Sequence, residues 1–304
     1  MALPRLAGVA DCCAIMKHQT RILIISLSFC AAGCSKRGNL PDEQRFSRLV
    51  TAAETGDVTQ QFEVGLAFHT SGNYPMAAYW LQKAADAGNA PAKQCLAFMH
   101  EEGKYFPQDY RRAMRLYREA AQQGFPRAIR SIGVMYRDGL GVAKDVQESI
   151  IWLKRAADLD MPEACNDLAV LYLNGQGAEK DETKAVYYCT RAAERGCVMA
   201  QRNLGELFFH GRAVRRDYVS AHKWFVLAAH RGDAKAQMYL ATMYEEGLGV
   251  PRDIPTSEQW RRLSAALGFE PAINRMRSAK EGERQCAPPN APSPLAQGTE
   301  GRSR

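Results

Sequence analysis

The 304-residue sequence lacks the short motifs that usually mark catalytic and metal-binding sites. It contains no Cys-x-x-Cys pair, which excludes the common zinc and thioredoxin-type motifs. It also contains no His-Glu-x-x-His motif and no pair of histidines four residues apart that could face a shared metal ion. We therefore expect no metal ion, no cofactor and no enzymatic activity.

Long apolar runs and clusters of basic residues are also missing. The apolar run at 22–32 is too short to span a bilayer, although it has the length of a signal-peptide core. The formal net charge is +7, but basic residues are interleaved with acidic ones, so we expect no nucleic-acid partner. Strand-like alternation of β-branched and aromatic residues is absent as well, which favours an all-α fold.

The apolar run ends in Ala31-Ala32-Gly33-Cys34. This stretch resembles the lipobox of bacterial lipoproteins, in which the cysteine is lipidated and becomes the mature N-terminus. The resemblance implies a signal peptide at 1–33, with its lipobox at 31–34, and a lipid on Cys34 as the only membrane anchor. Ser35 then implies an exported outer-membrane lipoprotein that faces the periplasm. An ordinary cleaved signal peptide and an uncleaved anchor are the alternatives, and Met16 is a candidate for the true start.

Most of the remaining chain repeats every 36 residues. A turn glycine recurs at 103, 139, 175, 211 and 247, and an aspartate follows each of them at 109, 145, 181, 217 and 253. Pairs of small residues recur at the same interval, and a bulky residue precedes each pair: Trp80, Leu116, Trp152, Tyr188, Trp224 and Trp260. A fixed period of this length is typical of solenoid proteins.

Apolar residues within one unit have helical spacing in two stretches, such as 164–172 and 185–193. Each unit is therefore predicted to be a hairpin of two helices, called helix A and helix B. Gly139 should end a helix A in the left-handed conformation, and Asp145 should cap the next helix B, with Glu148 completing a capping box. Because a phosphate-binding loop follows a strand, these glycines do not indicate one. The bulky residue of helix B is expected in the core between helices.

These units predict an all-α protein, a right-handed α-solenoid of about six stacked helix-turn-helix repeats. Residues 34–41 form a tether, and 42–280 form the solenoid. A capping helix is expected at each of its ends, at 42–55 and 270–280. The segment 281–304 is rich in proline, glycine and polar residues and is expected to be disordered.

The repeat pattern A-x-x-x-[LI]-[GA]-x-x-[YF]-x-x-G-x-G-x-x-x-D resembles the Sel-one-like repeat, a relative of the tetratricopeptide repeat. Residues 162–193 show it well, and the resemblance covers about 50–280. The second glycine of the loop is missing at positions 105 and 213, so those turns are expected to be made differently. The family implies a right-handed stack of hairpins that binds an extended partner on its inner face.

Alignment with the tetratricopeptide pattern places the second, sixth and ninth residues after the first alanine of each helix A on that inner face, which we call the helix-A face. The candidate binding residues there are Phe62, Gln94, Phe98, Arg130, Arg137, Asn166, Arg202, Glu206, Phe209 and Met238. Arginine can bind carboxylates through two hydrogen bonds, and the three phenylalanines could anchor apolar groups. The favoured function is a non-catalytic scaffold for a protein partner of the cell envelope.

Two alternatives remain open. The inner face could instead bind peptidoglycan or exopolysaccharide as an accessory protein. A penicillin-recognising enzyme is a weaker alternative, suggested by the Ser-x-x-Lys arrangement of Ser220 and Lys223. Among the cysteines, Cys165 and Cys189 are a candidate disulfide, because the start of a helix A lies opposite the end of helix B in a hairpin; the cysteines could equally remain thiols.

Overall fold

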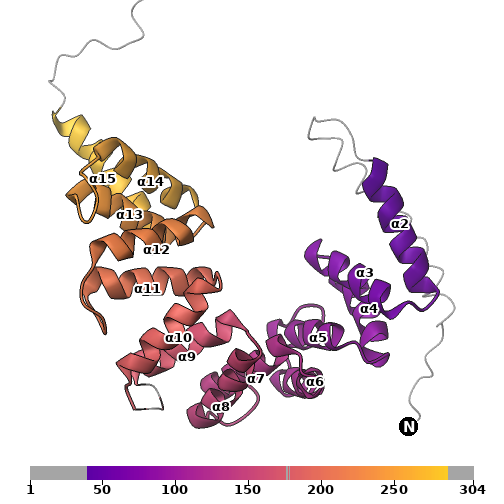
Figure 1. The fold of residues 1–304 in the computed structure, drawn as a ribbon. Coiled ribbons are helices and arrows are strands. Elements are labelled where there is room, and N and C mark those ends of the chain that lie inside the picture. The colour runs from indigo at the N-terminus through magenta and orange to yellow at the C-terminus, as the bar shows by residue number, and fades with distance from the viewer. Residues whose placement is uncertain (1–39, 176, 178, 287–304) are drawn as a thin grey trace, which may run out of the picture. The chain divides into compact units, whose positions relative to one another are not determined.

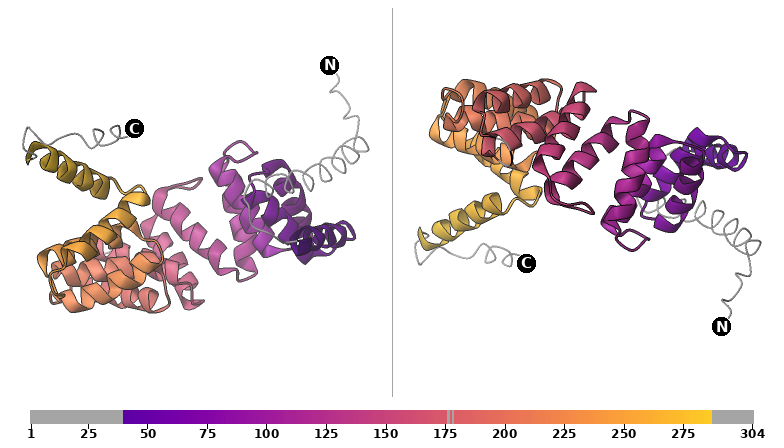
Figure 2. Two further views of the ribbon diagram at one scale, coloured as in Figure 1. Left: turned by 90° about the horizontal axis from the view of Figure 1, so that it is seen from above. Right: turned by 90° about the horizontal axis from the view of Figure 1, so that it is seen from below.

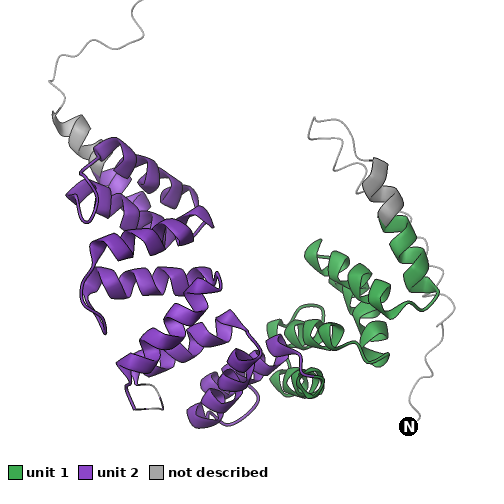
Figure 3. Cartoon of the chain, in the orientation of Figure 1, with its two compact units in different colours: residues 1–123 green, residues 124–304 purple. Residues whose placement is uncertain are grey.

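The computed structural model describes residues 40–175, 177 and 179–286. Within these ranges the protein is helical throughout and contains no strand. The chain divides into two compact units, Met1–Gln123 and Gly124–Arg304 (Figure 3). The predicted signal peptide, Cys34 and most of the predicted tail lie outside the described residues.

The first unit contains two complete hairpins. Its helices are α2 (Leu40–Glu54), α3 (Val58–Thr70), α4 (Tyr74–Asp86), α5 (Ala90–Glu102) and α6 (Tyr110–Gln122). Helices α3 and α4 form one hairpin, α5 and α6 form the next, and α2 packs on α3 (Figure 1).

The second unit contains four more hairpins. Its helices are α7 (Pro126–Asp138), α8 (Val146–Asp158), α9 (Pro162–Asn174), α10 (Glu182–Glu194), α11 (Val198–His210), α12 (Tyr218–His230), α13 (Ala234–Glu246), α14 (Ile254–Ala266) and α15 (Glu270–Cys286). Odd-numbered helices from α7 to α13 are helices A, each paired with the following helix B, and α15 packs on α14. Figure 2 shows this succession of helices in two further views, coloured from magenta through orange to yellow. The predicted total of six helix-turn-helix repeats is confirmed.

The last helix is longer than the sequence predicts. Helix α15 continues to Cys286, into the segment expected to be disordered from residue 281. The sequence Glu281-Gly-Glu-Arg-Gln-Cys contains one glycine but no proline, so the helix can continue until it approaches Pro288.

The loop between helices A and B confirms the predicted roles of Gly139 and Asp145. Gly139 ends α7 with φ 75°, and the Asp145 carboxylate accepts the backbone N–H of Glu148 at 3.0 Å. The predicted capping box is wrong. The N–H of Asp145 donates to the carbonyl of Tyr136 at 2.9 Å, while the Glu148 carboxylate accepts the indole N–H of Trp152 at 2.8 Å.

The two loops without a second glycine correct another expectation. Tyr105 has φ 69° and Ala213 has φ 63°, close to the φ of 69–71° at Gly141, Gly177 and Gly249. These turns are therefore made in the same way, with side chains in a conformation that costs a residue other than glycine about 1–2 kcal/mol. The hydrogen bond from the aspartate N–H back to helix A is also kept, because Asp109 and Asp217 donate to His100 and Phe208.

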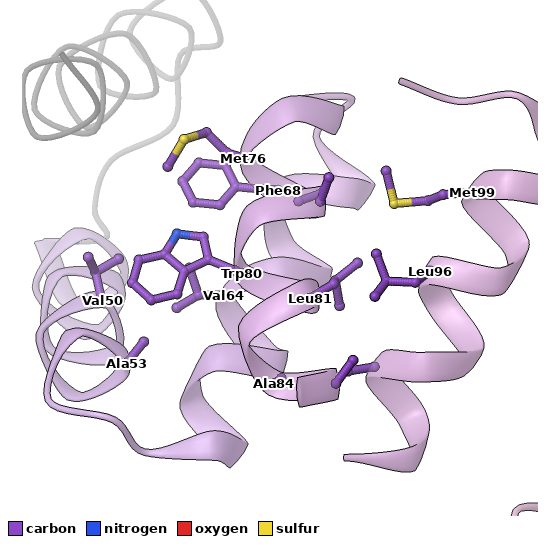
Figure 4. Close-up of a cluster of buried hydrophobic side chains, with 14 residues drawn as sticks. Val50, Ala53, Val64, Phe68, Met76, Trp80, Leu81, Ala84, Leu96 and Met99 are labelled. Atoms are coloured by element: carbon purple, nitrogen blue, oxygen red, sulfur yellow. The ribbon is translucent and has the colours of Figure 1, made fainter. Parts of the chain in front are cut away.

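The core position of helix B is one residue later than predicted. Trp80 is buried against α2, but Trp152, Trp224 and Trp260 are only half-buried. The fully buried large side chains lie one position after the predicted residue in four hairpins, at Leu81, Tyr117, Leu153 and Phe225. In Figure 4, Trp80 extends towards Val50 and Ala53, whereas Leu81 points towards Leu96 on the next helix A. We call the contact of a hairpin with the next helix A a joint.

Glycine allows the closest approach of helices within three hairpins. A Cβ atom added to Gly65, Gly133 or Gly205 would lie 2.8, 2.9 or 2.7 Å from Leu81, Leu153 or Phe225, respectively. Helix A carries Ala169 at the same position in the α9/α10 hairpin, and helix B carries Cys189. Helix B of this hairpin therefore has a much smaller side chain at this position than helix B of the neighbouring hairpins, which carries Leu153 or Phe225.

Candidate functional site

The polar residues of the helix-A face in the second unit are bound to each other across joints. The Nε of Arg130 on α7 donates to Asp167 on α9 at 2.7 Å, and the amide of Asn203 on α11 donates to Asn166 on α9 at 2.9 Å. These bonds link each helix A to the helix A of the next hairpin.

The same pattern continues at the next joint. The Nη1 of Arg202 donates at 3.0 Å to Asp233, which also caps α13 through the N–H of Ala236. Lys235 lies 2.9 Å from Glu206, which in turn lies 3.4 Å from Arg202. Arg130 and Arg202 therefore already have carboxylate partners, and the face presents balanced charges rather than a basic track.

Arg137 forms two hydrogen bonds with the neighbouring Asp138, both at 2.8 Å. These bonds raise the pKa of Arg137 and lower the pKa of Asp138 from their ordinary values. The arginine stays partly exposed on α7, with 31% of its side-chain surface accessible, so it can contact a partner.

The aromatic residues proposed for this face are half-buried. Phe209 packs at the joint of α11/α12 with α13, with ring centroids 5.3 Å from those of both Tyr218 and Tyr239. Phe225 stacks on Tyr239 at 4.6 Å, and His210 lies 6.0 Å from Tyr239. We call Phe209, His210, Phe225 and Tyr239 the aromatic cluster. Met238 is half-buried beside it on α13.

The candidate residues of the first unit lie on α3 and α5. Phe62 is half-buried against the hydrophobic core of that unit. The Phe98 ring lies 6.2 Å from His69, and the Lys104 ammonium lies 5.6 Å from its centroid. Gln94 is partly exposed, so of these three it has the side chain best suited to a polar contact with a partner.

A cavity of about 170 Å³ opens at the joint between the α9/α10 hairpin and α11. Its lining contains Glu206 of the helix-A face and Asn203, also on α11, together with the buried side chains of Ala185, Cys189 and Leu207. Of these residues, Glu206 was predicted as a binding residue and Cys189 only as a candidate disulfide cysteine. The missed signal is the small side chain of Cys189 at the position that holds Leu153 and Phe225 in neighbouring hairpins.

The cysteines do not form the predicted pair. Cys165 and Cys189 are free thiols in this structure, and both are buried. The Cys189 thiol points towards α11, where it donates to the Ala200 carbonyl at 3.5 Å. Burial raises the pKa of Cys189 to about 12 and also raises the pKa values of Cys165 and Cys197. At neutral pH these groups are protonated and poorly nucleophilic.

The Ser-x-x-Lys arrangement has a structural role at the start of α12. The Ser220 hydroxyl donates to the Asp217 carboxylate at 2.6 Å, and Asp217 caps the helix. Ser220 is thus held by an N-cap rather than by a general base, and Lys223 is exposed. In the part of the chain that the structure describes, no group of three or more His, Cys, Asp or Glu side chains could hold a metal ion.

Helical hairpins that repeat every 36 residues, each with a Gly–Asp loop between its two helices, define an α-solenoid repeat protein. The Sel1 repeat model matches six segments: 62–89, 96–125, 126–161, 162–197, 198–233 and 234–269. The chain therefore belongs to the Sel1 repeat family. Sel1-repeat proteins generally act as protein-interaction scaffolds.

Two solved structures support this assignment. A protective antigen of uropathogenic Escherichia coli is 32% identical, with a TM-score of 0.65, over 79% of this chain and 52% of the antigen. A Sel1 repeat protein from Oxalobacter formigenes is 27% identical, with a TM-score of 0.64, over 74% of this chain and all of the other.

A curated relative matches a shorter stretch. The Sel1-repeat-containing protein YjcO of E. coli K12 is 41% identical over 56 residues, which is 18% of this chain and 24% of YjcO. The matched parts thus span about half of the antigen and a quarter of YjcO. None of the helices in the described ranges is long and apolar enough to cross a membrane.

Proposed function

We propose that this protein is a non-catalytic scaffold of the bacterial cell envelope that binds an extended segment of a protein partner on its helix-A face. The observation that carries the proposal is the pairing of polar side chains along α7, α9, α11 and α13, which leaves a face with balanced charge. Because amides and paired charges suit the backbone and mixed side chains of a peptide, such a face favours a protein ligand.

The same pairing argues against the glycan alternative. An anionic polymer is bound best by cations that lack a carboxylate partner, whereas Arg130 and Arg202 already pair with Asp167 and Asp233, each only 9% exposed. Leaving a buried carboxylate without its partner costs several kcal/mol, on the order of 3–5. A neutral or mixed-charge peptide imposes no such cost.

The envelope part of the proposal rests on the lipobox-like sequence at 31–34. We propose that Cys34 is lipidated and that the repeats face the periplasm from the outer membrane. Metabolic labelling with a palmitate analogue tests this directly. Label should appear in the outer-membrane fraction and should be lost in Cys34→Ser, whereas an unlabelled soluble protein would contradict the anchor.

Crosslinking and affinity capture from native envelopes test the binding face. Arg137→Glu reverses one exposed charge on that face, and Arg155→Glu makes the same change at an exposed position of α8. We expect a stoichiometric protein partner whose recovery falls about tenfold in Arg137→Glu and is unchanged in Arg155→Glu. Equal recovery with both variants would show that the partner binds outside the helix-A face. Binding of the purified protein to purified peptidoglycan sacculi, in the absence of any other protein, would favour the glycan alternative.

A further inference from the structure

The cavity at the joint of α9/α10 with α11 has a specific cause in the repeat sequence. At the following joint, the equivalent space is filled by the aromatic cluster, in which Phe225 and Tyr239 stack with an interplanar angle of 4°. The residues 36 positions before the members of that cluster all line the cavity and are smaller: Leu173, Asn174, Cys189 and Asn203. The cavity is therefore the space that aromatic rings occupy one repeat later.

The lining changes from apolar at the floor to polar at the mouth. Ala169, Ala185 and Leu207 supply aliphatic surface, and the uncharged Cys189 thiol completes the floor. Val170 and Leu173 line the rest of the cavity together with the polar side chains of Asn174, Asn203, Glu206, His210 and Arg212. Such a lining favours a ligand with an apolar group that fills the floor and polar atoms that form hydrogen bonds at the mouth.

The size of the cavity limits its occupant. It measures about 170 Å³. An engineered cavity of about 150 Å³ in another protein binds benzene, whereas pockets for cofactors and drug-sized ligands are about 300–1,000 Å³. One aromatic ring fits in this space, and a nucleotide or a folded glycan does not.

We propose that this cavity receives one aromatic side chain, Phe or Tyr, of the extended partner segment that lies on the helix-A face. The inference rests on the proposed function, since Asn203 and Glu206 belong both to the cavity and to the helices of that face. The inserted ring takes the place that Phe225 and Tyr239 fill at the next joint. The Asn174 and Asn203 amides at the mouth then donate and accept hydrogen bonds at the attached peptide backbone, and the Glu206 carboxylate accepts them.

The cavity is tested first with side-chain analogues, using the full chain. Toluene and p-cresol should bind to the wild-type protein and shift the NMR signals of Leu207 and Ala185. Cys189→Leu places at this joint the residue that α8 carries as Leu153, and should weaken both ligands about tenfold or more. Asn203→Tyr, which copies Tyr239, is a second filling variant in case the first does not fold.

Tyr187→Leu is the matched control, because Tyr187 lies two residues before Cys189 on the same helix and is 58% exposed. It should bind both analogues as the wild type does. Absence of toluene and p-cresol binding to the wild type would overturn the inference, and so would unchanged binding by a folded filling variant.

Peptide selection separates this inference from the proposed function. A displayed library of random peptides should yield binders that share one Phe or Tyr and lose about tenfold in affinity for Cys189→Leu. Binders that compete at the helix-A face but tolerate Cys189→Leu would overturn the aromatic pocket and leave the scaffold intact. Failure to select any peptide, with toluene still bound, would count against the scaffold instead.

Discussion

The hairpins α9/α10 and α11/α12 have the same backbone arrangement but differ in the side chains that they pack against the next helix A. Both have a left-handed glycine at the end of helix A and an aspartate cap on helix B. The first pairs Ala169 with Cys189 and contains a cavity, while the second pairs Gly205 with Phe225 and is filled. The backbone of the repeat therefore tolerates either a packed joint or an open one, and a few side chains decide which is formed.

The largest expected effect comes from opening the filled joint. Phe225→Ala removes the ring that stacks on Tyr239 and should lower the free energy of unfolding by about 3–5 kcal/mol. Cys189→Ala, its control at the open joint, should cost about 1 kcal/mol or less, because little packing is lost there. Urea unfolding followed by circular dichroism measures both, and equal losses would show that the joints do not differ as described.

Crowding the filled joint should have the next largest effect. Gly205→Ala would bring a Cβ within 2.7 Å of the Phe225 ring and should destabilise the protein by about 1–3 kcal/mol. Since alanine is normally the better helix former by about 1 kcal/mol, the sign of the change is diagnostic. The loss should shrink in Gly205→Ala/Phe225→Cys, which recreates the open pair, and an increase in stability of Gly205→Ala would contradict the close approach.

The loops of the two hairpins offer a smaller contrast. Gly177 and Ala213 occupy the same loop position, with φ 70° and 63°, but only the second carries the strain of a side chain. Ala213→Gly should relieve this strain, but glycine also loses more backbone entropy on folding. The net gain in the free energy of unfolding should be up to about 1 kcal/mol, measured by thermal unfolding. The reverse change, Gly177→Ala, should destabilise it, because the added Cβ would meet Val146.

The smallest effect concerns the aspartate caps in acid. Hydrogen bonds from Ser220 lower the pKa of Asp217, and hydrogen bonds from Lys184 lower that of Asp181. A carboxylate with a lowered folded-state pKa stabilises the fold above its ordinary pKa of 3.8, and this contribution is lost as pH falls through the lowered value. NMR titration should show that the pKa of Asp217 rises in Ser220→Ala while that of Asp181 stays unchanged. An unchanged pKa of Asp217 would contradict the hydrogen bond from the Ser220 hydroxyl.

The 36-residue period was enough to predict the helices, their number and most caps, because a repeated local pattern identifies its own boundaries. The prediction failed where a choice depended on three-dimensional neighbours. The Glu148 carboxylate could accept a hydrogen bond either from the backbone N–H of Asp145 or from the indole N–H of Trp152. Because the Asp145 N–H donates to the Tyr136 carbonyl instead, Glu148 accepts from Trp152. Likewise, the core residue of helix B depends on how the helix is rotated about its axis, which places Leu153 rather than Trp152 inside.

The site was less predictable than the fold. The helix-A face could be assigned by alignment, but Asp167 and Asp233, the carboxylates that bind Arg130 and Arg202 across the joints, lie 37 and 31 residues away in the sequence. The cavity forms because four positions of this repeat carry smaller side chains than the next repeat does, and none of the four residues is unusual by itself. Comparing successive repeats position by position at Cys189 and Asn203 is the signal that could have found it.

The bonds between hairpins have a consequence for how such chains change in length. Buried Gln201 and Gln237 each donate to the last turn of the preceding helix B, at the carbonyls of Ala193 and Ala229, so both of these links connect adjacent hairpins. Gain or loss of a whole repeat by recombination would therefore break one junction and rebuild an equivalent one at the same place. Open joints such as that at Cys189 could then be copied or deleted as units, giving relatives of different length different spacings of their binding pockets.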